Sequence, residues 1–129
     1  MAHVVDTCGW IEWLTDGVLA DKYAPYLESL EAVYVPTSVQ FELYKWVKRE
    51  SSEEQALEVI ALTEQGIVTA LDTAISLAAA DFSVRYKLSF ADAIIYATAQ
   101  QMSVPLITSD DHFEGLPEVE YFSKKSGQI

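Results

Sequence analysis

Short β-rich runs alternate with longer helical patterns along almost the whole chain, and this alternation constrains the fold more than any other feature. Five runs favour strands, and the segments between them carry apolar residues at helical spacing. The expected strands are Ala2–Val5, Ala32–Val35, Ile67–Ala70, Val104–Thr108 and Val119–Phe122. Strands that alternate with helices indicate an α/β fold, with a parallel sheet sandwiched between helices.

Several of the expected helices open with a residue that favours the N-cap position, where a side-chain oxygen accepts a first-turn N–H. The full set of expected helices is Cys8–Leu14, Val18–Leu30, a helix to Arg49 capped by Thr37 or Ser38, a helix to Thr63 capped by Ser52, Thr73–Tyr86 capped by Asp72, Ser89–Met102 and the short turn Asp110–Phe113. A chain of 129 residues is of single-domain size, so we expect residues 1–129 to form one domain.

The chain is strongly acidic, with a formal net charge of −12. This is unexpected for a protein that handles nucleic acid, because a basic surface usually supplies affinity for phosphates. The charge could serve solubility, could mark carboxylates that need cations, or could complement a basic partner chain. Small basic stretches could still steer a phosphate backbone, although such stretches are usually solvated. They are Lys45 with Lys48 and Arg49, Arg85 with Lys87, and Lys124 with Lys125.

Nothing in the sequence indicates a membrane or secreted protein. No apolar run approaches the roughly 20 residues of a membrane span, and the N-terminus lacks the pattern of a signal peptide. The lone cysteine, Cys8, allows no internal disulfide and fits a reducing compartment. We therefore expect a cytoplasmic protein without membrane contact.

Two acids stand where expected strands end. Asp6 follows the first strand and Asp110 follows the fourth. Each could simply cap the helix or turn that comes next. In open parallel sheets, however, ligands bind beyond the carboxyl ends of the strands, where the strand order reverses. The same two positions are therefore candidates for a metal site.

Two further acids lie on expected helices. Glu42 flanks the apolar stripe of its helix and could be an ordinary solvated residue. Asp92 could be the acid at position N3 of a capping box that Ser89 opens at the N-cap. Because the helix after Asp92 is mostly apolar, an acid in its first turn needs a partner, either the backbone or a cation.

Each of these four acidic positions is weak evidence for a site by itself, but the four together are stronger evidence. If the first and fourth strands are neighbours, the acids converge: Asp6, Glu42, Asp92 and Asp110. Clustered carboxylates cannot all stay ionised without cations. An all-oxygen site suits Mg²⁺ or Mn²⁺, which would activate water and polarise a phosphate oxygen. The chain lacks the His and Cys spacings of zinc sites.

With these acids at these spacings, the chain resembles the PIN-domain ribonucleases, in particular the VapC-type toxins. The resemblance runs over essentially the whole chain and rests on the segments Val4–Trp13, Phe41–Tyr44, Ser89–Ala99 and Leu106–Phe113. It implies a five-stranded parallel sheet of order 3-2-1-4-5. It implies Mg²⁺ or Mn²⁺ held by the acids at positions 6, 42, 92 and 110, and hydrolysis of RNA, often tRNA.

The resemblance also implies partners, and the chain departs from the family pattern at two positions. Many members are toxins that form dimers and are neutralised by a cognate antitoxin. Thr7 and Thr108 match polar positions beside the first and fourth acids. Cys8 stands where many members have Asn, and His112 stands where they often have an acid, which leaves Asp111 as the candidate substitute.

Other functions stay open on the sequence alone. A receiver-like regulatory module is also a five-stranded α/β protein with Mg²⁺ at its sheet edge. It would need an acceptor such as Asp72 and a lysine such as Lys124, but the paired acids expected after its first strand are absent. A housekeeping RNA-processing nuclease, or a relative that only binds a partner or RNA, would share the same pattern.

Overall fold

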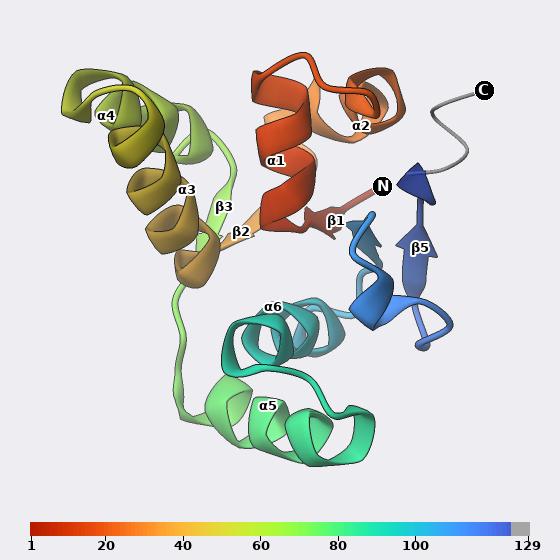
Figure 1. The fold of residues 1–129 in the computed structure, drawn as a ribbon. Coiled ribbons are helices and arrows are strands. Elements are labelled where there is room, and N and C mark those ends of the chain that lie inside the picture. The colour runs from red at the N-terminus through yellow and green to blue at the C-terminus, as the bar shows by residue number, and fades with distance from the viewer. Residues whose placement is uncertain (125–129) are drawn as a thin grey trace.

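Five parallel strands form one sheet, in the order β3-β2-β1-β4-β5, in the computed structural model, which describes residues 1–124 (Figure 1). All four neighbouring pairs are parallel. The strands are β1 (His3–Val5), β2 (Val33–Pro36), β3 (Ile67–Thr69), β4 (Leu106–Thr108) and β5 (Val119–Tyr121). The expected fold class and strand order are confirmed.

Helices cover both faces of this sheet. They are α1 (Thr7–Leu14), α2 (Ala20–Leu27), α3 (Thr37–Glu50), α4 (Glu53–Thr63), α5 (Thr73–Tyr86) and α6 (Phe90–Gln101), with the 3₁₀ turns η1 (Leu30–Ala32) and η2 (Asp111–Phe113). The first four helices lie on one side of the sheet and α5 and α6 lie on the other (Figure 1). This division follows from the strand order, because the chain crosses the opposite face when it returns from β3 to β4.

Three of the expected helix caps are present. Ser52, Asp72 and Ser89 each accept a hydrogen bond from the backbone N–H three residues further on, at 3.1, 2.9 and 3.3 Å. Each bond satisfies one of the N–H groups that the first turn of a helix leaves without a partner.

Two local expectations are wrong. The helix expected over Val18–Leu30 is only α2, because Ser29 adopts φ −113° and ψ 84°, outside the helical region, and the chain tightens into η1. Neither Thr37 nor Ser38 caps α3; the cap position is Pro36, which makes no side-chain hydrogen bond. β2 thus runs directly into α3, and Pro36 at φ −60° supplies the extended residue that joins them.

The core lies between the sheet and its two helical layers. Val4, Val5, Leu106 and Ile107 have no exposed surface, and burial of side chains of this size stabilises the fold by roughly 1.5–3 kcal/mol each. Every residue of the stretch 93–99 in α6 is buried. The two central strands and α6 therefore form the rigid base on which the acidic side chains are mounted.

Within residues 1–124, no helix combines the length and the apolar character that a crossing of the bilayer requires.

Candidate active site

The strand order reverses between β1 and β4, and two acids meet there. The backbone N–H of Asp6 donates to the carbonyl of Ile107 at 3.0 Å, which extends the β1–β4 pairing by one residue. The hydroxyl of Thr108, the last residue of β4, donates to Asp6 Oδ2 at 2.8 Å. A reversal of this kind is where α/β sheets bind ligands.

Asp6 is the most buried of the four acids, with 4% of its surface exposed. Its Oδ1 accepts the N–H of Thr7 at 2.8 Å, so it caps α1 while Oδ2 faces β4. Burial raises the pKa of Asp6 to about 7, and the charges of Asp92 and Asp110 add to this against the lowering effect of its hydrogen bonds. The predicted N-cap role of Asp6 is confirmed, and its other carboxylate oxygen accepts the hydroxyl of Thr108 at the end of β4.

Glu42 reaches the same place from α3. The hydroxyl of Thr7 donates to Glu42 Oε1 at 2.6 Å, which ties this half-buried carboxylate to the start of α1. The charge of Glu42 also contributes to raising the pKa of Asp92. Glu42 is therefore oriented by a neighbour and is not the freely solvated residue that a helical glutamate usually is.

Asp92 lies in the first turn of α6, half-buried. Burial raises its pKa first, and the charge of Asp110 raises it further, whereas His112 lowers it. The buried α6 thus carries an acid at its N-terminal end whose negative charge is opposed by burial and by the neighbouring carboxylates.

Asp110 begins the η2 turn and is fixed on two sides. Its N–H donates to the hydroxyl oxygen of Thr108 at 2.9 Å, and its Oδ1 accepts the N–H of His112 at 2.9 Å. The Thr108 hydroxyl therefore holds the backbone of Asp110 and the carboxylate of Asp6 together.

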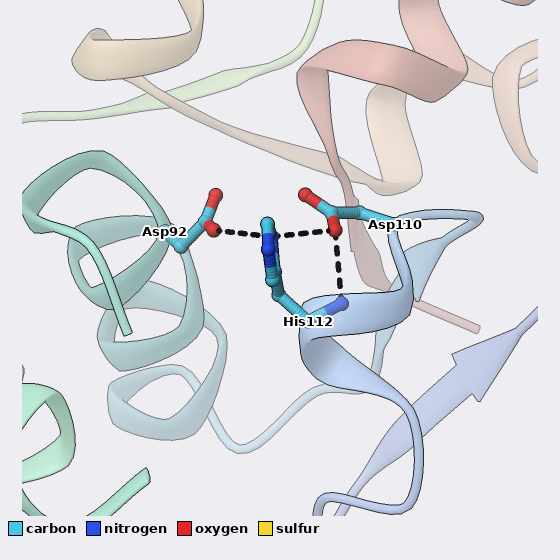
Figure 2. Close-up of side chains that lie close together, drawn as sticks. All are labelled: Asp92, Asp110 and His112. Carbon is cyan, nitrogen blue, oxygen red and sulfur yellow. Dashed lines mark hydrogen bonds and ion pairs between the residues drawn. The ribbon is translucent and has the colours of Figure 1, made fainter. Parts of the chain in front are cut away.

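His112 stands at a position that the resemblance relates to the site, but it was not among the four site residues predicted from the sequence. Its Nδ1 lies 2.9 Å from Asp110 Oδ1 and 3.5 Å from Asp92 Oδ2, between the two carboxylates (Figure 2). Within the described residues, these three side chains are the group whose ligand atoms lie close enough to share a cation, all within 4.8 Å of one another. Asp111, the candidate substitute for an acid at position 112, is exposed and does not belong to this group.

Cys8 lies against the site without a nucleophilic role. Its Sγ is 3.5 Å from Asp6 Oδ2 and 3.6 Å from Ser109 Oγ. Burial and the charge of Asp6 raise the pKa of the thiol, so it is protonated at neutral pH and acts as a weak donor to Asp6.

Two open pockets flank the acids. One has a volume of 250 Å³ and is lined by Thr7, Ile11, Phe41, Glu42, Lys45, Trp46 and Arg49. The ammonium of Lys45 lies 5.9 Å from the centre of the exposed Phe41 ring. The other has a volume of 670 Å³ and is lined by Cys8, Ser109, Asp110, Asp111, Glu114, Tyr121, Ser123 and Lys124. Lys125, the other basic residue of that stretch, lies outside the described residues.

The donor set fits a divalent cation. Carboxylate oxygens predominate, as hard cations such as Mg²⁺ and Mn²⁺ prefer. Burial and the neighbouring carboxylates raise the pKa of Asp6 and of Asp92, so the ionised form of each is disfavoured relative to an acid in water. A cation bound beside them would favour the ionised form of both carboxylates.

Comparisons with known proteins agree with this architecture. The family model of the PIN domain matches residues 3–119. A toxin–antitoxin complex from Klebsiella pneumoniae has a chain that is 22% identical, with a TM-score of 0.78 and coverage of 92% of this chain and 96% of that one. DNA-bound VapBC from Salmonella typhimurium is 14% identical, with a TM-score of 0.74 and coverage of 96% and 98%. Mycobacterium tuberculosis VapC20, a sarcin-ricin loop cleaving toxin, is 15% identical, with a TM-score of 0.68 and coverage of 99% and 96%. No protein with a curated description matches the chain.

Proposed function

This chain belongs to the PIN domain family, and on that premise we propose that it is a metal-dependent endoribonuclease that hydrolyses RNA phosphodiesters. The observation that carries the proposal is the gathering of acids from four separate elements near the β1–β4 reversal. The acids are Asp6, Glu42, Asp92 and Asp110. Asp92 and Asp110 lie close enough to share an ion, whereas Asp6 and Glu42 lie outside that group and act on it through their charges. One buried and three half-buried carboxylates gathered in this way are costly for stability and are typical of sites that hold cations.

We assign the metal to Asp6, Asp92 and Asp110, with Glu42 either joining them or orienting the attacking water. A bound Mg²⁺ or Mn²⁺ would polarise a phosphate oxygen and lower the pKa of water. Thr7 holds the Glu42 carboxylate in a fixed direction, and Thr108 does the same for Asp6. The rigid placement of these carboxylates reduces the reorganisation that the reaction needs.

RNA is the proposed substrate, and tRNA and ribosomal RNA are the first candidates. The pocket beside Glu42 offers Lys45 and Arg49 for phosphates and the exposed ring of Phe41 for a base. Stacking on an aromatic ring and ion pairing with phosphates are how proteins hold unpaired nucleotides. The solved relative VapC20 is a toxin that cleaves the sarcin-ricin loop, which supports an RNA target in this fold.

We further propose that the protein is the toxin of a toxin–antitoxin pair, acts in the cytoplasm as one domain, and is neutralised by an antitoxin. Two solved relatives are complexes of that type. A groove of 560 Å³ between α1, α3 and α4 has an apolar lining that includes Leu14, Trp46 and Leu62, with Glu50 and Glu58 beside it. A groove of this character suits an amphipathic segment with basic residues, which the net charge of −12 would also attract.

We also propose a homodimer. The α5 face carries Leu77 and Val84 with 64% and 83% of their surfaces exposed. Exposed apolar side chains on one helix are typical of a surface that another protein covers. A second copy of this chain is the occupant that the family resemblance suggests.

Incubation of the purified, partner-free protein with total cellular RNA tests the nuclease. We expect discrete fragments with Mg²⁺ or Mn²⁺, none with EDTA, and none from the Asp6→Asn variant. An RNA-processing role would rest on the same site, so the identity of the cleaved RNA separates it from a toxin.

No observation favours the receiver-like alternative. Asp72, its candidate acceptor, is exposed and caps α5 through the N–H of Ile75. Covalent labelling by a small phosphodonor, without RNA cleavage, would favour the receiver.

A further inference from the structure

His112 is placed by local geometry where a metal ligand would stand. Its backbone N–H donates to Asp110 Oδ1, which fixes the start of the η2 turn. The imidazole then projects from that turn toward α6, so that Nδ1 comes between Asp110 and Asp92 (Figure 2). The ring is thus directed into the acidic site and not along the surface, although 70% of the side chain is exposed.

The spacing of these donors is that of ligands around one ion. Two neighbouring ligands of an octahedral cation, each about 2.1 Å from it, lie about 3 Å from each other. Nδ1 of His112 is 2.9 Å from one carboxylate oxygen and 3.5 Å from the other. The Asp92 and Asp110 side chains are 18% and 27% exposed, so they are held in place while the His112 side remains open to an entering ion.

We propose that His112 is a ligand of the catalytic metal, and that the resulting nitrogen–oxygen site prefers Mn²⁺ to Mg²⁺. This inference rests on the proposed nuclease function and adds to it the kind of ion. Mg²⁺ favours oxygen donors and keeps its waters, whereas transition ions gain from an imidazole nitrogen. With only carboxylates, the site would discriminate less between the two ions.

The other histidine cannot serve in this way. Nε2 of His3 is 2.6 Å from the carbonyl of Tyr26, and Nδ1 is 3.1 Å from the carbonyl of Met1. The residue is 7% exposed. Because the chain contains two histidines, an imidazole signal at a bound ion has only one source, His112.

The test is pulsed electron paramagnetic resonance of Mn²⁺ bound to the full chain, purified without a histidine tag. We expect ¹⁴N modulation from a coordinated imidazole in the wild type and in the neighbouring control Asp111→Asn. We expect none in His112→Asn or His112→Asp. Titrations should show roughly tenfold or greater weakening of Mn²⁺ binding in His112→Asn. His112→Asp should lower the ratio of Mn²⁺ to Mg²⁺ affinity, because it replaces nitrogen with oxygen.

The outcomes separate this inference from the nuclease itself. Mn²⁺ bound without ¹⁴N modulation would overturn the inference and leave the nuclease proposal standing. Tighter Mn²⁺ binding in His112→Asn would also overturn it, because the ring would then compete with the ion. A folded wild-type protein that binds no Mn²⁺ would overturn both.

Discussion

The hydroxyl of Thr108 donates a hydrogen bond of 2.8 Å to the carboxylate of Asp6, across 102 residues of sequence. The same oxygen accepts the N–H of Asp110 at 2.9 Å. One buried side chain therefore joins the ends of β1 and β4 and sets the positions of two acids. Thr108 has no exposed surface, so water cannot replace it without rearrangement of the core.

Replacement of Thr108 by valine should impair the site more than the fold. The change keeps the shape but removes the hydrogen bond that lowers the pKa of Asp6, so that pKa should rise further. Loss of the bond should weaken divalent-ion binding by about tenfold, with a similar fall in cleavage rate at neutral pH. Thr98→Val is the matched control, because it also removes a buried hydroxyl, one that bonds within α6. Equal losses of ion binding in both variants would contradict a specific role for Thr108.

The buried carboxylate of Asp6 should make stability depend on pH. Its pKa rises from 3.8 to about 7 on folding, so the folded state holds the proton more tightly than the unfolded chain does. Its contribution to stability is therefore full below pH 3.8 and is lost as the pH rises through about 7. Without metal at pH 8, Asp6→Asn should be more stable than the wild type, by at most roughly 4 kcal/mol.

Thermal unfolding in EDTA from pH 4 to pH 8 measures this difference. The unfolding temperature of the variant should rise relative to that of the wild type as the pH rises. The addition of Mn²⁺ should stabilise only the wild type. If the difference in unfolding temperature between the variant and the wild type does not change with pH, ionisation of the buried Asp6 does not destabilise the fold.

The basic side chains beside Glu42 should contribute to RNA binding and not to chemistry. Lys45 and Arg49 line the pocket that Glu42 and Thr7 share. Their joint replacement by alanine should raise KM, leave kcat nearly unchanged, and reduce the salt dependence of binding by about 0.7 per lost phosphate contact. Arg85→Ala with Lys87→Ala on the opposite helical layer is the control and should change neither. A fall in kcat alone would place Lys45 or Arg49 in the chemistry instead.

The exposed apolar face of α5 should hold a dimer together. Leu77→Glu with Val84→Glu places charges on that face without touching the core, so the fold should persist while self-association is lost. Sedimentation equilibrium measures the mass directly. Leu57→Glu on α4, where the side chain is 55% exposed, is the control. An unchanged mass in the α5 variant would place any dimer interface elsewhere.

The sequence predicted the α/β architecture because the spacing of apolar residues that indicates strands and helices is a local pattern. Buried strands such as β1 and β4 are short apolar runs, and the helices between them keep a helical period. The order of the strands depends on contacts between distant segments, so it came from the family resemblance and not from periodicity. The helix expected over 18–30 was too long for a related reason. The chain leaves the helical conformation at Ser29, and serine is not a residue whose type predicts a break.

The candidate site was predictable in part. Asp6 looked ambiguous because caps and metal ligands favour the same residue type in the same place. In the structure one carboxylate oxygen accepts the Thr7 N–H as a cap, and the other accepts the Thr108 hydroxyl on the side where we propose the metal. His112 was not assigned to the site because its contact with Asp92 depends on how η2 packs against α6. No spacing rule in the sequence encodes that packing.

The comparison of Asp110→Asn with Asp111→Asn tests the central claim most directly, since the two acids are neighbours in sequence but only Asp110 belongs to the cluster. The measurement is the rate of cleavage of the identified RNA at saturating Mn²⁺, with fold checked by circular dichroism. We expect Asp110→Asn to lose at least about a hundredfold in rate, as loss of a metal ligand should, and Asp111→Asn to stay within about threefold of the wild type. Full activity in Asp110→Asn, or equal losses in both variants, would contradict an active site at the β1–β4 reversal.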